Sequence, residues 1–202
     1  MMLTHSSRLQ GAKFLSLWTG ANLLGGFLIG YLEGNGLEFM ASLMLTGAIV
    51  GSLQWTVLRL TGCRFRWWPV ASTLGWIIGT YVLTASQSLY HPVAAGLERQ
   101  LGLSEVFWLH LLDTPLWVLF MALAQSLVLV RHRRWAGPWL LASLLGGVAL
   151  AVVRQGMCSA FCQSLPLSLS GLDDGIGWAA YGLVTGIAWL ILSEREAEAR
   201  EV

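Results

Sequence analysis

The chain has 202 residues and a net charge of +1, with 55% hydrophobic and only 11% charged residues. Roughly a quarter of the residues in a water-soluble domain are charged, so this chain has too little polar surface to cover a soluble globule. The composition excludes a soluble domain and indicates an integral membrane protein.

Six apolar stretches are each long enough, at about 20 residues, to cross the roughly 30 Å hydrocarbon core of a bilayer as helices. They cover residues 14–33, 38–60, 69–89, 106–130, 138–154 and 175–193. We therefore expect an all-α membrane protein with a cytoplasmic segment at 1–13, a six-helix transmembrane domain at 14–193 and a charged cytoplasmic tail at 194–202. The first stretch lacks a signal-peptide cleavage pattern and is expected to stay as a helix.

The distribution of basic residues predicts the orientation. If the N-terminus is cytoplasmic, the outer loops carry only Arg99 and Arg154 of the 12 basic residues. The inner segments carry the others: Arg8, Lys13, Arg59, Arg64, Arg66, Arg131, Arg133, Arg134, Arg195 and Arg200. The positive-inside rule then places both termini in the cytoplasm. Topology accounts for these charges, so no nucleic-acid partner is expected.

The sequence repeats itself with an offset of 71 residues, which places Gln54 on Gln125 and Trp68 on Trp139. Weaker matches link Trp18 to Trp67, "GFLIG" at 26–30 to "GWIIG" at 75–79, and "GLVTGIAW" at 182–189 to "GAIVGSLQ" at 47–54. We interpret the chain as three two-helix units, about 14–60, 67–131 and 138–193. Units of one orientation are related by an axis along the membrane normal and predict a compact bundle.

Small residues on helix faces are typical of helix contacts in lipid, where close backbone approach and polar side chains hold helices together. The predicted packing glycines are Gly26, Gly30, Gly47, Gly51, Gly75 and Gly79. An amide that faced lipid would lack hydrogen-bond partners, so Asn22, Gln54 and Gln125 are placed in helix interfaces. Packing is the favoured role for these amides, and ligand binding is the alternative.

The fourth stretch carries His110 and Asp113 on one helical face, with Pro115 just after them. Proline removes a backbone hydrogen bond, so a kink is expected there. A carboxylate within a membrane span is a candidate functional group, and a histidine one turn away could share its proton. The alternative is structural, with His110, Thr114 or Arg154 neutralising Asp113. Together with the three amides, these two residues form the candidate intramembrane polar site.

The outer loops and the cysteines leave further alternatives open. The stretches at 88–102 and 154–175 are long for helix connections, and they either fold over the outer end of the bundle or form interfacial helices. The spacing of Cys158 and Cys162 permits a disulfide if that side is oxidising, and two free thiols are the alternative. No metal site is expected, since no histidine or further cysteine lies nearby.

Two motifs carry a resemblance. Gly47-x-x-x-Gly51-x-x-Gln54-Trp55-x-Val57-Leu58-Arg59 is followed by Trp68-x-x-Ala71-Ser72-x-Leu74-Gly75-Trp76-x-x-Gly79. This pattern resembles repeats in a family of multi-pass bacterial membrane proteins, common in cyanobacteria, that has no assigned activity. The resemblance implies a repeat-built bundle in a bacterial inner membrane or thylakoid membrane, and it implies no reaction.

The sequence lacks the common hydrolase, metalloprotease and nucleotide-binding motifs, so we expect no enzymatic activity and no cofactor. The favoured function is that of a helix-packing module or accessory subunit that contacts lipids and other membrane subunits. One alternative is a small-solute transporter or substrate-binding membrane component that uses Asp113, His110 and the outer loops. Another is a pigment- or lipid-binding protein, with His110 as a ligand to a pigment or haem.

Overall fold

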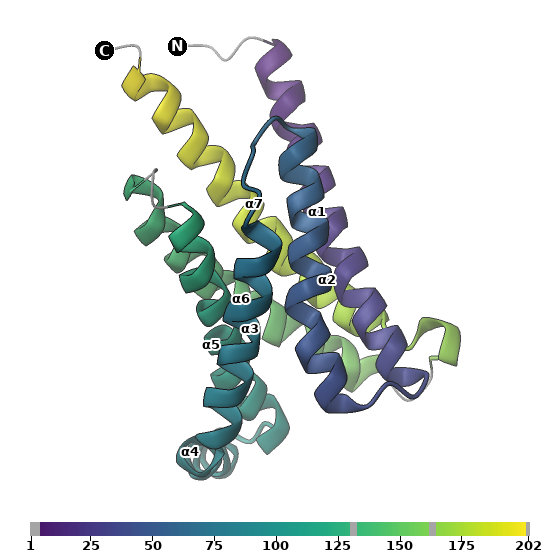
Figure 1. Cartoon of the computed structure of the whole chain (residues 1–202). Helices are drawn as coiled ribbons and strands as arrows, with labels where there is room; N and C mark the ends of the chain where they lie inside the picture. The colour runs from purple at the N-terminus through teal and green to yellow at the C-terminus, as the bar shows by residue number, and fades with distance from the viewer. Residues whose placement is uncertain (1–4, 130–132, 162–164, 201–202) are drawn as a thin grey trace.

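The structure is a computed structural model that describes residues 5–129, 133–161 and 165–200. The described residues form α-helices with one short 3-10 helix and no strand (Figure 1). The elements in chain order are α1 (His5–Gly34), α2 (Phe39–Leu60), α3 (Trp68–Ala85), α4 (Gln87–Leu101), α5 (Glu105–Val128), α6 (Arg133–Phe161), η3 (Leu167–Leu169) and α7 (Leu172–Arg200).

The long helices form a closed ring. Each packs against the next in the order α1, α2, α3, α5, α6 and α7, and α7 returns to pack extensively against α1. The first described turn of α1 and the last turn of α7 lie at the same end of the bundle, and α4 lies at the opposite end (Figure 1). We call these the terminal end and the distal end.

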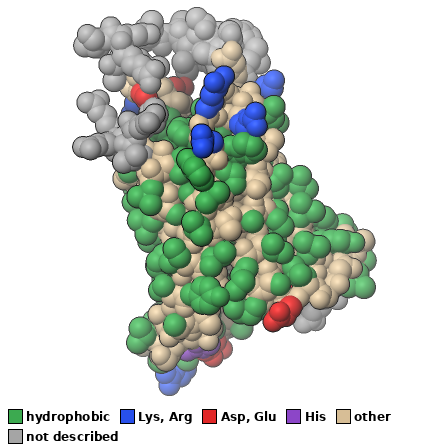
Figure 2. Space-filling model, in the orientation of Figure 1, with side chains coloured by type: hydrophobic (Ala, Val, Ile, Leu, Met, Phe, Trp, Pro, Cys, Tyr) green, Lys and Arg blue, Asp and Glu red, His purple; other side chains and the backbone are tan. Residues whose placement is uncertain are grey.

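Five regions of helix within the described residues are long and apolar enough to cross a membrane: Gln10–Gly34, Phe39–Leu60, Glu105–Val128, Trp135–Ser159 and Leu167–Glu196. The 18-residue α3 is not among them, so the expectation of six spans is not confirmed. Helix α3 is the shortest helix of the ring, and it contains no charged residue. Hydrophobic side chains nevertheless cover much of the middle of the face in Figure 2, with lysine and arginine gathered toward the terminal end.

The stretch expected as one span at 69–89 is divided in the structure. Helix α3 ends at Ala85, where the Ser86 hydroxyl donates to the Val82 carbonyl, and α4 begins at Gln87. Helix α4 exposes Leu89, Val93 and Leu101, and it packs mainly against α5. A short helix at the end of a bundle with an exposed apolar stripe is typical of a membrane interface.

The fifth stretch is longer than expected, because α6 continues past Arg154 to Phe161. The charge of Arg154 marks the predicted end of the span at 154. In the structure, the guanidinium is neutralised by Asp174 of α7, so the helix has no need to end there.

All six predicted packing glycines lie against another segment of the chain. Gly47 and Gly51 of α2 lie against α3, Gly75 and Gly79 of α3 lie against α5, and Gly26 and Gly30 of α1 lie against α7 or the residues just before it. A Cβ added to Gly75 would lie 2.6 Å from the backbone oxygen of Phe120, so only glycine permits this approach.

Two contacts between helices each pair a glycine with a larger residue, but the glycine lies on opposite sides of the two contacts. Between α2 and α3, Gly47 lies against Trp76, whereas between α5 and α6 the small residue is on the other helix, where Gly147 lies against Val118. Gly47 and Val118 are related by the offset of 71 residues, and so are Trp76 and Gly147. We call each such contact between two helices a seam, and in both seams a glycine on one helix faces a larger side chain on the other.

The cysteines differ in state. Cys63, in the loop between α2 and α3, is a free thiol, and Cys158 of α6 is disulfide-bonded. Cys162 lies outside the described residues.

Candidate functional site: a closed hub and a polar pocket

The terminal half of the bundle is centred on a group of buried residues that we call the tryptophan–glutamine hub. Every helix of the ring contributes at least one member, and the members are Trp18, Asn22, Gln54, Trp68, Ser72, Gln125, Trp139 and Trp189. Trp18, Trp68 and Trp139 contact one another with ring centroids 5.6–6.4 Å apart. Trp189 contacts all three.

Hydrogen bonds join the hub across helix boundaries. The indole N–H of Trp68 donates to Gln54 Oε1 at 3.1 Å, and that of Trp139 donates to Gln125 Oε1 at the same distance. The Gln54 amide donates to Asn22 Oδ1 at 2.9 Å, and the Gln125 amide donates to Ser72 Oγ at 2.8 Å and to Gln54 Oε1 at 3.3 Å. These polar groups satisfy one another, so the hub offers no group to a ligand.

The hub also changes the register of one sequence match. The sequence pairs Trp18 with Trp67, but Trp67 is 57% exposed whereas Trp18 and Trp68 are both fully buried and in contact. The sequence has two tryptophans in a row at 67 and 68 and two glycines in a row at 25 and 26, so the first helix can be aligned with the third in two ways that differ by one residue. Burial favours the alignment of Trp18 with Trp68.

His110 and Asp113 form a separate pair on α5. His110 Nδ1 lies 3.8 Å from Asp113 Oδ1, too far for a hydrogen bond, and the Thr114 hydroxyl donates to Asp113 Oδ1 at 3.1 Å. Arg154, considered as a neutralising partner of Asp113, pairs with Asp174 instead. The structure therefore does not combine His110 and Asp113 with Gln54, Gln125 and Asn22 into one polar site. Helix α5 continues through Pro115.

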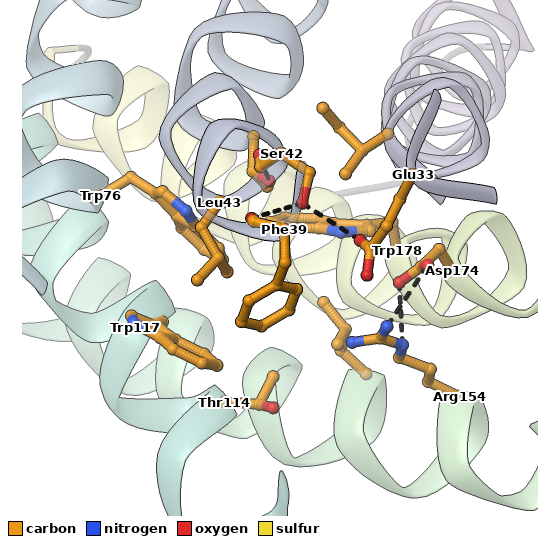
Figure 3. A pocket seen from close by; sticks show the side chains of 13 residues that line it. Glu33, Phe39, Ser42, Leu43, Trp76, Thr114, Trp117, Arg154, Asp174 and Trp178 are labelled. Atoms are coloured by element: carbon orange, nitrogen blue, oxygen red, sulfur yellow. Dashed lines mark hydrogen bonds and ion pairs between the residues drawn. The ribbon is translucent and has the colours of Figure 1, made fainter. Parts of the chain in front are cut away.

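The distal half contains a cavity of about 50 Å³ that we call the distal pocket (Figure 3). Residues from α1, α2, α3, α5, α6 and α7 line it: Ile29, Glu33, Phe39, Ser42, Leu43, Thr46, Trp76, Thr114, Trp117, Leu150, Arg154, Asp174 and Trp178. Each helix of the ring thus contributes to the pocket.

Charged groups lie along one side of this pocket. Arg154 Nε lies 2.8 Å from Asp174 Oδ1, and a second guanidinium nitrogen lies 3.4 Å from Oδ2. Glu33 accepts a hydrogen bond of 3.1 Å from the Ser42 hydroxyl and lies within electrostatic range of Asp174 (Figure 3). These charged residues were not among the predicted site residues, although Arg154 is one of the two outer exceptions in the charge distribution.

Aromatic rings form the opposite side. The Trp76 ring stacks on that of Trp117 at a centroid distance of 6.1 Å and contacts that of Trp178 at 5.6 Å. Trp76 is 4% exposed, and the indole N–H groups of Trp76 and Trp117 are buried without a hydrogen-bond partner among the described residues. A buried donor without a partner costs free energy, and both of these side chains line the pocket.

The described residues contain no group of three or more metal-ligating side chains. The lining of the pocket consists of hydroxyl, carboxylate, guanidinium and indole groups together with apolar side chains. No family model, curated protein or solved structure matches this chain, so the resemblance of residues 47–79 to a bacterial repeat family stays a prediction.

Proposed function

We propose that the chain crosses the membrane six times with both termini on the cytoplasmic side. Both described ends of the chain lie at one end of the bundle, which supports an even number of crossings (Figure 1). As an 18-residue helix, α3 is roughly 27 Å long, close to the thickness of a hydrocarbon core. It would therefore be the sixth crossing, with Trp68, Trp76 and Thr80 buried against its neighbours.

We also propose that the ring consists of three equivalent hairpins, α1–α2, α3–α5 and α6–α7. Trp18, Trp68 and Trp139, from the first helix of each hairpin, meet at the hub. One turn further along lie the buried Asn22, Ser72 and Ser143. Three equivalent positions that meet around one axis support a threefold internal repeat.

The function that the geometry supports best is the binding of a small polar solute by an integral membrane protein. The observation that carries this proposal is the lining of the cavity, which combines the carboxylate of Glu33 with the side chains of Trp76 and Trp117, whose indole N–H groups have no hydrogen-bond partner among the described residues. A cavity with only a packing role would be apolar or would satisfy its own donors, as the hub does.

A cavity-filling variant tests the proposal. Thr46 lines the pocket and its hydroxyl donates only to the Ser42 carbonyl of its own helix, so Thr46→Leu fills space without breaking a contact between helices. Thr56→Leu is the matched control, because Thr56 makes the same bond to Ser52 on an exposed face. We expect small ammonium, carboxylate or neutral polar solutes to raise the melting temperature of the wild-type protein and of Thr56→Leu, but not of Thr46→Leu. No response from the wild-type protein to any solute class would contradict the proposal.

The role expected first from the sequence, a packing module or accessory subunit, stays a prediction. The glycine seams and the hub that suggested it join helices of this one chain, so they are explained without a partner. Absence of enzymatic activity likewise stays a prediction.

A further inference from the structure

The distal pocket has an uncompensated negative charge. Of its three charged lining residues, Arg154 and Asp174 form a two-point ion pair and cancel. Glu33 has the neutral hydroxyl of Ser42 as its hydrogen-bond donor and has no cationic side chain within ion-pair distance among the described residues. A carboxylate in this position, half-buried and close to a second carboxylate, favours a cation.

The aromatic side of the pocket favours the same charge. Trp76 and Trp117 line the cavity opposite the charged groups, and Trp178 lies beside Glu33 and Asp174 (Figure 3). Indole faces attract cations within about 6 Å of the ring centroid, and tryptophan does so most strongly among the aromatic side chains.

The volume limits the size of the cation. An apolar cavity of about 150 Å³ holds benzene, whereas this cavity is about 50 Å³. It therefore accommodates a primary ammonium group with one or two neighbouring carbons more readily than a trimethylammonium group.

The unpartnered indole donors indicate that the ligand also carries a hydrogen-bond acceptor. The indole N–H groups of Trp76 and Trp117, on side chains that line the pocket, have no hydrogen-bond partner among the described residues. A ligand that satisfies either of them needs an acceptor oxygen, because an ammonium group has no lone pair.

We propose that the distal pocket binds a primary ammonium group carried on a small molecule with an acceptor oxygen, with Glu33 as the counter-ion and Trp76 as a hydrogen-bond donor. The ethanolamine group has this chemistry, either as free ethanolamine or as the headgroup of phosphatidylethanolamine. This inference rests on the proposed solute-binding function and names the chemical class of the solute.

The first experiment uses the full-length protein in detergent without amine-containing lipid. Tryptophan fluorescence and melting temperature are measured with ethanolamine, choline and ethylene glycol at matched ionic strength. We expect ethanolamine alone to raise the melting temperature, choline to be excluded by size, and ethylene glycol to be inactive for lack of charge.

The matched variants are Glu33→Gln and Glu38→Gln, which remove one carboxylate each at the distal end. Glu38 is exposed before the first turn of α2 and does not line the pocket. We expect Glu33→Gln to weaken ethanolamine binding at least about tenfold and Glu38→Gln to leave it unchanged. Trp76→Phe is expected to weaken binding by several-fold, because it removes the donor and keeps the ring.

A second arm identifies the source of the ammonium group. The protein is placed in nanodiscs of phosphatidylglycerol alone or mixed with phosphatidylethanolamine or phosphatidylcholine. Stabilisation by phosphatidylethanolamine that is lost in Glu33→Gln, without a response to free ethanolamine, assigns the site to the lipid headgroup. A response to free ethanolamine that phosphatidylethanolamine does not compete with assigns it to the free solute.

The outcomes separate this inference from the function on which it rests. If acetate or a neutral polyol stabilises the wild-type protein but not Thr46→Leu, and ethanolamine does not, the ammonium assignment is wrong and solute binding stands. If ethanolamine stabilises Glu33→Gln as strongly as the wild-type protein, the assignment is also wrong. If no solute or lipid distinguishes the wild-type protein from Thr46→Leu, both proposals fail.

Discussion

The hub and the distal pocket use the same helices and nearly the same residue types, but they differ in how their polar groups are satisfied. In the hub, the indole N–H groups of Trp68 and Trp139 donate to Gln54 and Gln125. In the pocket, about two helical turns further along α3, the indole N–H of Trp76 has no partner among the described residues. Burial of polar groups is thus compensated within the chain in the hub, whereas in the pocket two buried donors have no partner among the described residues.

The proposed repeat sharpens this contrast. At the hub, the three equivalent positions all carry tryptophan. At the same sequence distance beyond each of these tryptophans lie Glu33, Leu83 and Arg154, which are an acid, an apolar residue and a base. Of these three residues, Glu33 and Arg154 line the pocket. Under the proposed repeat, equivalent positions are therefore alike at the hub and unlike toward the distal end.

The largest expected effect comes from the seam that connects the two regions. Gly75 lies between Trp68 and Trp76 on α3, and an added Cβ would lie 2.6 Å from the Phe120 backbone oxygen. We expect Gly75→Val to destabilise the protein by at least about 3 kcal/mol, measured by SDS titration. The control is Gly20→Val, because a Cβ added to Gly20 would meet no atom of another described segment within 4 Å. Equal losses in both variants would show that helix propensity, rather than the seam, determines the effect.

The next largest expected effect is the loss of stability when the ion pair between Arg154 and Asp174 is broken. Arg154→Met leaves Asp174, with a side chain that is only 13% exposed, without its counter-ion. We expect a loss of about 2 kcal/mol, less than for a fully buried pair because Arg154 is partly solvated. Adding Asp174→Asn should restore most of the loss. If the double variant is as unstable as the single one, the pair does not account for the effect.

A smaller effect compares the same substitution in both regions. Trp68→Phe removes the shorter of the two hydrogen bonds that Gln54 Oε1 accepts, so we expect a loss of about 1 kcal/mol beyond that from reduced packing. Trp76→Phe removes an unpartnered donor and should cost less in the absence of ligand. SDS titration of the two variants without added solute measures the difference. A larger loss for Trp76→Phe would show that its N–H is satisfied in the unliganded protein.

The smallest effect concerns Cys63, which packs against the hub from the loop at the terminal end. Burial, with a smaller contribution from Glu196, raises the pKa of the Cys63 thiol above its ordinary value, although a hydrogen bond with Thr61 opposes the shift. Because the thiolate is the reactive form, a raised pKa means slower maleimide labelling at pH 7 and a rate that increases well above pH 9. Comparison with Cys63→Ser identifies the labelled thiol. Labelling as fast as that of an unhindered cysteine at neutral pH would contradict the burial of this loop.

Much of the architecture was predictable from the sequence, because apolar length and periodicity locate the long helices. Gln54 and Gln125 were placed in helix interfaces on the ground that an amide cannot face lipid, and in the structure they contact each other. The break between α3 and α4 was missed, because the apolar stretch was extended through Ser86 and Gln87 to Leu89, although α4 is much less apolar than α3.

The distal pocket could not be predicted from apolar length and periodicity, because its lining residues come from six different helices. Its ion pair joins Arg154 to Asp174, and its third charged residue, Glu33, comes from the first helix of the chain. Such pairs depend on how α1, α6 and α7 meet, which no local pattern specifies. The position of Arg154, one of only two basic residues in the predicted outer loops, indicated that it has an unusual role, but the sequence did not identify Asp174 as its ion-pair partner.

The exchange of large and small residues between the seams has a consequence for folding. If α2 met α6 in place of α3, Gly47 would face Gly147 and leave a void, and if α5 met α3 through the corresponding face, Val118 would collide with Trp76. Hairpins of such similar sequence would otherwise be interchangeable during assembly. The mismatch penalises incorrect orders, so similar building blocks can close into a single arrangement.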